Sequence, residues 1–168
     1  MIILGIDPGI AITGWGTIKS EVNNSHVIDY NQICTKHGVS LSQRLYIIHK
    51  ELKGVIKKYK PDCAAVEQLF FAKNVKTALA VGHARGVVLL TIQQAAIDFF
   101  EYTPLQIKQA VTGYGRADKQ QMQKMVKCML KLNEVPKPDD AADALAVALC
   151  HNQMKKWQQI KRAVTSQT

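Results

Sequence analysis

Apolar residues along this chain change from strand-like to helix-like spacing several times, and these changes divide it into predicted elements. Three short apolar segments occur near the N-terminus, at residues 2–6, 13–19 and 27–34. A Pro-Gly turn at residues 8–9 separates the first two segments. Short strands that follow one another after short turns are typical of an antiparallel meander. We therefore expect this part of the chain to form three neighbouring strands.

Helical spacing begins at Leu45 and lasts to Tyr59, and Pro61 follows directly. The segment CAAVEQLF at residues 63–70 then predicts a strand buried on both faces, which is typical of a central position in a parallel sheet. A helix, a strand and a short helix are predicted after it, at residues 74–96, 99–104 and 105–111. This order predicts an α/β fold with a five-stranded mixed sheet flanked by helices.

Two further helices are expected in the C-terminal third of the chain. Asp118, followed three residues later by Gln121, has the spacing of a capping box at the start of a helix. The last helix is expected to begin near Asp139, after the sequence VPKP. The chain ends in a polar and basic segment. We therefore predict one domain at residues 1–154 and a basic, frayed tail at residues 155–168.

The helix predicted at residues 74–96 is apolar on more than one face. Between Ala78 and Ile92 it is apolar almost all round, although packing on a sheet requires only one apolar stripe. Gly82 and Gly86, four residues apart, would allow another backbone to approach closely. We expect a homodimer contact on this helix. A second helix of the same chain covering this face is the alternative.

The chain carries a large positive charge. Lys and Arg number 22 against 13 Asp and Glu, which gives a formal charge of +9. This balance favours a polyanionic partner, either nucleic acid or an anionic membrane surface. Four widely spaced cysteines without metal-ligand partners predict free thiols. The sequence shows neither a signal peptide nor an apolar stretch of membrane-spanning length, so we expect a soluble cytoplasmic protein with no membrane partner.

Acidic residues stand at positions where a strand or helix would be expected to be apolar. Asp7 ends the first apolar strand, and Glu67 lies near the end of the strand at residues 63–70. Neighbouring strands lie about 5 Å apart, so these two carboxylates meet if their strands pair. Asp143 lies one turn inside the last helix, among Ala and Leu. A buried carboxylate without a partner is costly, so Asp143 requires a cation.

The sequence DDAAD at residues 139–143 leaves two interpretations open for its first two acids. Asp140 and Asp143 are three apart and Asp139 and Asp143 are four apart, so either pair shares a helix face. Acidic residues in a first helical turn also commonly satisfy free amides and the positive end of the helix dipole. Spacing alone does not decide which of Asp139 and Asp140 joins Asp143.

Converging carboxylates in a basic protein indicate a divalent cation, because the acids would otherwise repel one another. Oxygen ligands without His or Cys favour Mg²⁺, with Mn²⁺ as a substitute. Two such ions about 4 Å apart would clamp a scissile phosphate, activate water on one side and stabilise the leaving oxygen on the other. The predicted reaction is phosphodiester hydrolysis, and the positive charge of the chain suits a nucleic-acid substrate.

Six sequence motifs over residues 1–152 resemble those of the RuvC family of bacterial Holliday junction resolvases. They occur in the family's order and approximate spacing: GIDPG, TGWG, VEQLFFAKN, ARG, TGYGRADKQQM and DDAADALAVA. The resemblance implies a ribonuclease H-like fold, a homodimer, and Mg²⁺-dependent symmetric nicking of two opposed strands of four-way junction DNA during recombination and repair. It also implies work beside a branch-migration motor complex.

The resemblance also assigns site residues by position. It implies four catalytic metal ligands, namely Asp7, Glu67, Asp140 and Asp143, and three DNA-binding residues, namely Phe70, Lys108 and Lys119. Asp140 is chosen because the family's D-A-A-D pattern matches residues 140–143, which leaves Asp139 as an extra acid. Phe70 matches an aromatic residue that stacks on an unpaired base at the junction centre. Without the resemblance, Phe70 would suit the hydrophobic core equally well. Lys119 could then be a solvated lysine at the start of a helix.

Other functions remain as alternatives. A phosphotransferase of the actin or sugar-kinase type also uses a D-x-G motif, but its two-lobed architecture needs about twice this length. A non-catalytic binder of branched nucleic acid on the same fold is a second alternative, and the complete carboxylate set argues against it. A nuclease acting on other branched DNA or RNA is a third, which the sequence leaves open.

Overall fold

Five strands form one mixed sheet in the computed structural model, which describes residues 1–21, 24–68 and 75–165, without the side chains of residues 75–77 and 156–165. The strands are β1 (Ile2–Asp7), β2 (Ile12–Ser20), β3 (Ser25–Cys34), β4 (Cys63–Glu67) and β5 (Asp98–Tyr102). Their order in the sheet is β3-β2-β1-β4-β5. The first three strands pair antiparallel, whereas β4 lies parallel to both β1 and β5. The predicted meander and the predicted mixed sheet are both confirmed.

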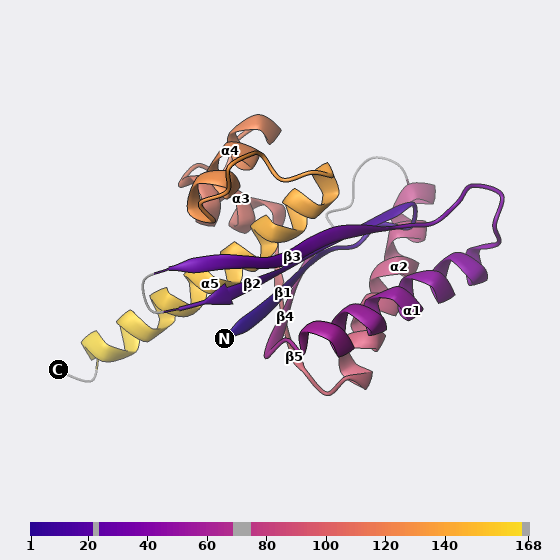
Figure 1. Cartoon of the computed structure of the whole chain (residues 1–168), viewed down its shortest axis with the longest axis horizontal. Coiled ribbons are helices and arrows are strands. Elements are labelled where there is room, and N and C mark those ends of the chain that lie inside the picture. The colour runs from indigo at the N-terminus through magenta and orange to yellow at the C-terminus, as the bar shows by residue number, and fades with distance from the viewer. Residues whose placement is uncertain (22–23, 69–74, 166–168) are drawn as a thin grey trace.

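Helices cover both faces of this sheet (Figure 1). On one face lie α1 (Leu41–Tyr59) and α2 (Val75–Gln94). On the other lies α5 (Asp139–Thr165), and α3 (Pro104–Thr112) and α4 (Lys119–Met129) pack against it. None of the described helices is both long enough and apolar enough to cross a membrane. The four cysteines are free, as predicted.

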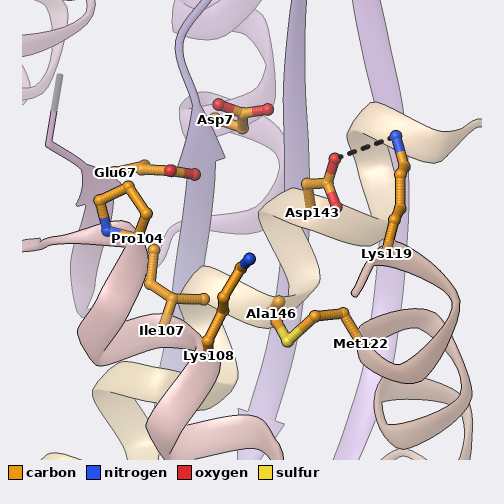
Figure 2. A pocket seen from close by; sticks show the side chains of 9 residues that line it. All are labelled: Asp7, Glu67, Pro104, Ile107, Lys108, Lys119, Met122, Asp143 and Ala146. Atoms are coloured by element: carbon orange, nitrogen blue, oxygen red, sulfur yellow. Dashed lines mark ion pairs between the residues drawn. The ribbon is translucent and has the colours of Figure 1, made fainter. Parts of the chain in front are cut away.

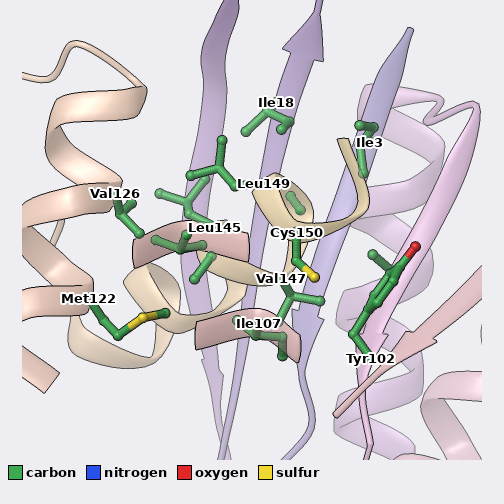
Figure 3. Close-up of a cluster of buried hydrophobic side chains, with 14 of the residues drawn as sticks. Ile3, Ile18, Tyr102, Ile107, Met122, Val126, Leu145, Val147, Leu149 and Cys150 are labelled. Carbon is green, nitrogen blue, oxygen red and sulfur yellow. The ribbon is translucent and has the colours of Figure 1, made fainter. Parts of the chain in front are cut away.

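Alternate residues of the central strands face opposite layers, and each layer has its own core. Leu4 and Ile6 of β1 pack toward α1 and α2, whereas Ile3 packs toward α5, and all three are fully buried. Figure 3 shows the core on the α5 side, where Leu145 and Leu149 of α5 lie against the sheet. The strand predicted to be buried on both faces is therefore confirmed for β4, which belongs to both cores.

Two predicted strands end earlier than expected. The strand predicted at residues 99–104 ends at Tyr102, because the Thr103 side chain accepts a hydrogen bond from the Gln106 amide and caps α3, with Pro104 as its first residue. The strand predicted at residues 63–70 ends at Glu67, and its last two residues lie outside the described part of the chain.

The last helix extends further than the sequence indicates. It continues to Thr165, through most of the segment for which a frayed tail is predicted. The division of the chain at residue 154 stays a prediction.

The backbone of α5 lies directly against β1 and β2, and glycines make this contact possible. A Cβ atom added to Gly5 would lie 2.0 Å from the Ala144 carbonyl oxygen and 2.7 Å from the Ala148 amide nitrogen. A Cβ atom at Gly14 would lie 2.0 Å from the carbonyl oxygen of Asp140. Only glycine allows such a close approach within a strand. This contact brings the first turn of α5 to the ends of β1 and β2.

A methyl group at Gly5 is expected to destabilise the protein. Gly5→Ala forces backbone against backbone and should lower the free energy of unfolding by at least about 2 kcal/mol, as overpacked cores do. Gly54→Ala is the matched control, because nothing lies within 4 Å of a Cβ atom at this position in α1. That change should raise stability by about 0.5–1 kcal/mol through helix propensity. Urea unfolding followed by circular dichroism measures both, and a Gly5→Ala variant as stable as wild type would contradict the proposed contact.

His151 is a buried titratable residue of α5 that packs against β4 and β5. It is 3% exposed, its Nδ1 lies 2.8 Å from the Tyr102 hydroxyl, and its Nε2 lies 3.4 Å from the Cys63 sulfur. Its ring also packs on Phe100, with a centroid separation of 4.4 Å. Burial, helped by the charge of Lys155, lowers the pKa of His151 to about 4. The folded protein therefore holds this imidazole neutral.

The protein should become less stable as the pH falls, because of His151. The unfolded chain takes up a proton near the ordinary pKa of about 6.5 and the folded chain only near 4, so stability is complete above pH 6.5 and is lost as the pH falls through this window. This difference corresponds to about 3 kcal/mol at most. Urea unfolding at pH 7.5 and pH 4.5 should show a smaller pH effect in His151→Gln than in wild type. Equal pH effects in the two proteins would contradict the assignment.

Candidate active site

Asp7 and Glu67 lie side by side at the ends of two parallel strands. The register pairs Ile6 of β1 with Val66 of β4, so Asp7 and Glu67 occupy the next positions of the same two strands. Their side chains follow Gly5 and Ala65 in the alternation and therefore face the α5 layer of the sheet. The pairing of these two strands, on which the predicted meeting of the two acids depends, is confirmed.

A cavity of about 300 Å³ opens beside these two carboxylates, between the sheet and the three helices on the α5 side. Figure 2 shows the residues that line it, which are Asp7, Glu67, Pro104, Ile107, Lys108, Lys119, Met122, Asp143 and Ala146. Acidic side chains thus come from β1, β4 and α5, and the two lysines from α3 and α4. The cavity combines apolar walls with five charged groups.

Asp143 faces this cavity from the second turn of α5. The residues beside it, Ala142 and Ala144, are buried, and the Ala144 carbonyl oxygen lies against Gly5 of β1. Its Oδ2 lies 3.5 Å from the Nζ of Lys119, the ion pair drawn in Figure 2. Burial raises the pKa of Asp143, and Lys119 opposes this rise. Asp143 is partly exposed in this structure, and the cation predicted for it is Lys119.

The two lysines belong to two different helices, Lys119 at the start of α4 and Lys108 in the middle of α3. Lys119 is the first residue of α4, and the capping box predicted from Asp118 and Gln121 is confirmed there, since each side chain accepts a hydrogen bond from the other residue's amide. Lys108 belongs to α3, and Figure 2 shows its side chain pointing toward the three carboxylates. Its positive charge lowers the pKa of Glu67, although burial acts more strongly in the opposite direction.

Burial and mutual repulsion raise the pKa values of the two strand-end acids. Burial, followed by the charges of Asp143 and Asp140, raises the pKa of Asp7 to about 7. Burial, followed by the charges of Asp7 and Asp143, raises the pKa of Glu67 to about 8. Both groups ordinarily titrate near pH 4. The two lysines thus leave the carboxylates short of positive charge, and a cation entering the cavity would keep all of them ionised.

The first two acids of α5 differ in where they lie. Asp140 does not line the cavity, but its charge raises the pKa of Asp7, and its carbonyl oxygen packs against Gly14. Asp139 lies outside the cavity and pairs with Lys119 and Lys137 instead. The structure therefore brings Asp7, Glu67 and Asp143 together around one cavity, and Asp139 and Asp140 are not part of its lining.

The fit of these carboxylates to a metal ion follows from their oxygen-only chemistry. Among residues 1–21, 24–68 and 75–165, no group of three or more His, Cys, Asp or Glu side chains is already close enough to hold an ion directly. Mg²⁺ keeps several water molecules and commonly binds proteins through one or two carboxylates. A partly hydrated ion suits the open cavity, and the raised pKa values of Asp7 and Glu67 indicate the missing positive charge.

Sequence reasoning missed the walls of the cavity and the partners of its lysines. Ile107 and Met122 carry helical apolar spacing, which indicates burial but not which cavity a residue lines. The pairing of Lys119 with two acids of α5 joins residues that are 20 or more positions apart and left no local signal. Phe70, the predicted aromatic contact, lies outside the described residues.

The strand order of the mixed sheet, with acidic side chains at the ends of its central parallel strands, places this protein in the ribonuclease H-like fold class. The family model described as Crossover junction endodeoxyribonuclease RuvC matches residues 3–151. A Crossover junction endodeoxyribonuclease RuvC from Ruminiclostridium cellulolyticum is 58% identical over 151 residues, which cover 90% of this chain and 91% of the relative. The chain belongs to the RuvC family.

Solved structures agree with this membership. The structure of Thermus thermophilus RuvC in complex with a Holliday junction substrate has a TM-score of 0.89 and 33% sequence identity, and the match covers 94% of this chain and 96% of the other. The yeast mitochondrial Holliday junction resolvase has a TM-score of 0.75 at 13% identity, over 98% of this chain and 83% of the other. The second likeness concerns the fold alone. The predicted ribonuclease H-like fold and the RuvC resemblance are both confirmed.

Proposed function

We propose that this chain is a structure-selective endodeoxyribonuclease that resolves Holliday junctions by paired symmetric nicks, in recombination and DNA repair. The observation that carries this function is the convergence of Asp7, Glu67 and Asp143 on one cavity of a protein with a charge of +9. Membership of the RuvC family supports it, as does the likeness to a RuvC structure that contains a Holliday junction substrate.

The reaction is proposed to depend on Mg²⁺, with Mn²⁺ as a substitute and two ions in each site. The proposed ligands are Asp7, Glu67, Asp140 and Asp143. These residues would hold the metal, which would supply activation of the attacking water and stabilisation of the leaving oxygen of the phosphodiester. The chain's own contribution is to fix the carboxylates at the strand ends and to offset part of their charge with Lys108 and Lys119.

Three further residues are proposed to contact DNA. Lys108 and Lys119 reach the cavity from α3 and α4, where their ammonium groups would meet backbone phosphates as point charges. Phe70 is proposed to stack on an unpaired base at the junction centre, a contact worth about 1–3 kcal/mol per base. A branch-migration motor complex is proposed as a further partner on the RuvC resemblance alone.

The protein is proposed to act as a homodimer through α2. Leu79 and Leu90 of this helix are 63% and 55% exposed, and a Cβ atom at Gly86 would meet nothing within 4 Å. No part of the described chain covers these residues, so they are free for a second copy. Two opposed strands must be cut symmetrically and one chain carries one carboxylate site, so a two-fold dimer matches the substrate.

Asp7→Asn is expected to abolish cleavage while leaving junction binding intact. The change removes a proposed metal ligand but no phosphate contact, so cleavage should fall at least about a hundred-fold. The assay compares a labelled mobile four-way junction with a linear duplex, with Mg²⁺ and with EDTA. Wild type should nick two opposed strands of the junction only when Mg²⁺ is present.

The matched control for this experiment is Asp98→Asn. Asp98 is exposed at the start of β5, at the opposite end of the parallel strands from Asp7, so its loss should leave cleavage unchanged. Undiminished cleavage by Asp7→Asn would remove Asp7 from the active site. Cleavage by wild type in EDTA would refute the metal requirement, and equal cleavage of the duplex would refute the junction as substrate.

Leu90→Glu is expected to separate the proposed dimer into monomers. A buried glutamate at the α2 contact would be unpaired, and its desolvation should weaken the dimer by several kcal/mol. Light scattering over a dilution series should show twice the chain mass of 18.7 kDa for wild type. The variant should show the mass of one chain. Tyr46→Glu on α1 is the control, since Tyr46 is also exposed but lies on another helix. A wild type that is monomeric at micromolar concentration would rule out the dimer.

A further inference from the structure

Lys119 lies between two carboxylates of α5, and only one of them faces the cavity. Its Nζ is 3.3 Å from Oδ2 of Asp139 and 3.5 Å from Oδ2 of Asp143. The other carboxylate oxygen of Asp139 is 3.0 Å from the Nζ of Lys137. These four residues form a row of alternating charge that leads from the cavity to the surface.

Asp139 does not act as a helix cap in this arrangement. The amides of Ala141 and Ala142 in the first turn of α5 donate to the carbonyl oxygen of Pro138, at 3.1 and 3.2 Å. Both carboxylate oxygens of Asp139 lie against lysines instead, and its side chain is 42% exposed. The helix start therefore does not account for this acid.

A divalent ion and Lys119 compete for the same carboxylate. Asp143 is a proposed metal ligand, and its Oδ2 contacts the Lys119 ammonium. A metal ion bound to Asp143 would repel this ammonium, which then needs another acceptor within reach. Asp139 precedes Asp143 by four residues, so it lies on the same helix face, and its Oδ2 already contacts the ammonium.

We propose that Asp139 is a positioning residue that holds Lys119 away from Asp143 when a metal ion binds there. This inference rests on the proposed metal-binding role of Asp143. Asp139 lowers the competition between the lysine and the metal, and it keeps the ammonium at the edge of the cavity, where DNA would enter. Lys137 balances one oxygen of Asp139 and leaves the other for Lys119. Only the side chain of Lys119 has to move from Asp143 to Asp139, because the capping box fixes the backbone at the start of α4.

The test is a double-mutant cycle on Mn²⁺ binding by the full chain without DNA, measured by electron paramagnetic resonance of the free ion. Asp139→Asn should raise the apparent Kd about three- to five-fold when Lys119 is present, the scale of one exposed ion pair. In the Lys119→Ala background the same change should have an effect of about two-fold or less, because no lysine is left to compete. Lys119→Ala alone should tighten Mn²⁺ binding.

Asp118→Asn is the matched control for loss of negative charge near Lys119. Asn caps helices as well as Asp does, so α4 should keep its start, and Mn²⁺ affinity should change by about two-fold or less. Asp139→Ser serves as a second variant, since Ser also suits a helix start, and thermal unfolding checks that each variant is folded.

The outcomes separate this inference from the proposed function. An equal effect of Asp139→Asn with and without Lys119 would mean that only its charge matters, and would overturn the positioning role. The positioning role would also be overturned if Asp139→Asn left the Mn²⁺ affinity unchanged in a chain that keeps Lys119. If wild type bound no Mn²⁺ at all, the proposed metal site would fail and the inference with it.

Discussion

The contact between the α5 backbone and the backbones of β1 and β2 determines where the carboxylates can meet. Asp7 and Glu67 are neighbours through strand pairing alone, but Asp143 belongs to a helix that must come down onto the sheet to join them. Gly5 and Gly14 remove the side chains that would hold this helix away. A helix that packs on a sheet through ordinary side chains lies about 10 Å from it, which would leave Asp143 outside the cluster. The glycines of the N-terminal motifs are therefore as necessary to the site as its acids.

The same contact gathers negative charge at a cost that the rest of the fold must offset. Burial and repulsion raise the pKa values of Asp7 and Glu67 to about 7 and 8, so the ionised site is unfavourable by itself. Fully buried side chains on both faces of β1 and β4 hold the strand ends in place against this repulsion. Lys108 and Lys119 supply part of the missing positive charge from helices whose starts are capped. The site is thus rigid in its backbone and incomplete in its charge, which suits a pocket that binds cations.

Much of the site could be predicted from the sequence because its signals are local. An acid directly after an apolar strand, as at Asp7 and Glu67, and an acid among small apolar residues, as at Asp143, each violate the burial pattern of their own element. The end of β5 was missed because the Thr103 cap and the helix-starting Pro104 outweigh the strand propensity of the aromatic residues before them. Asp139 pairs with Lys119, a contact between distant residues that no local pattern records, and the spacing of DDAAD by itself leaves Asp139 and Asp140 equivalent. An acid that violates the apolar pattern of its own strand or helix can be recognised in the sequence as a candidate site residue. Its contact partners can be identified only from the tertiary structure.

The position of the site follows from the one strand at which the sheet changes direction. β1 pairs antiparallel with β2 and parallel with β4, so the carboxyl ends of β1 and β4 lie together at the strand at which the direction of the sheet changes. Open α/β sheets commonly bind ligands outside the carboxyl ends of their parallel strands. Side-chain alternation then separates two tasks. Asp7 and Glu67 face the α5 layer, where DNA and metal are proposed to bind, while Leu4 and Ile6 support the layer of α2, where a second copy is proposed to bind. Chemistry and association can therefore vary independently, one on each face of the same strands.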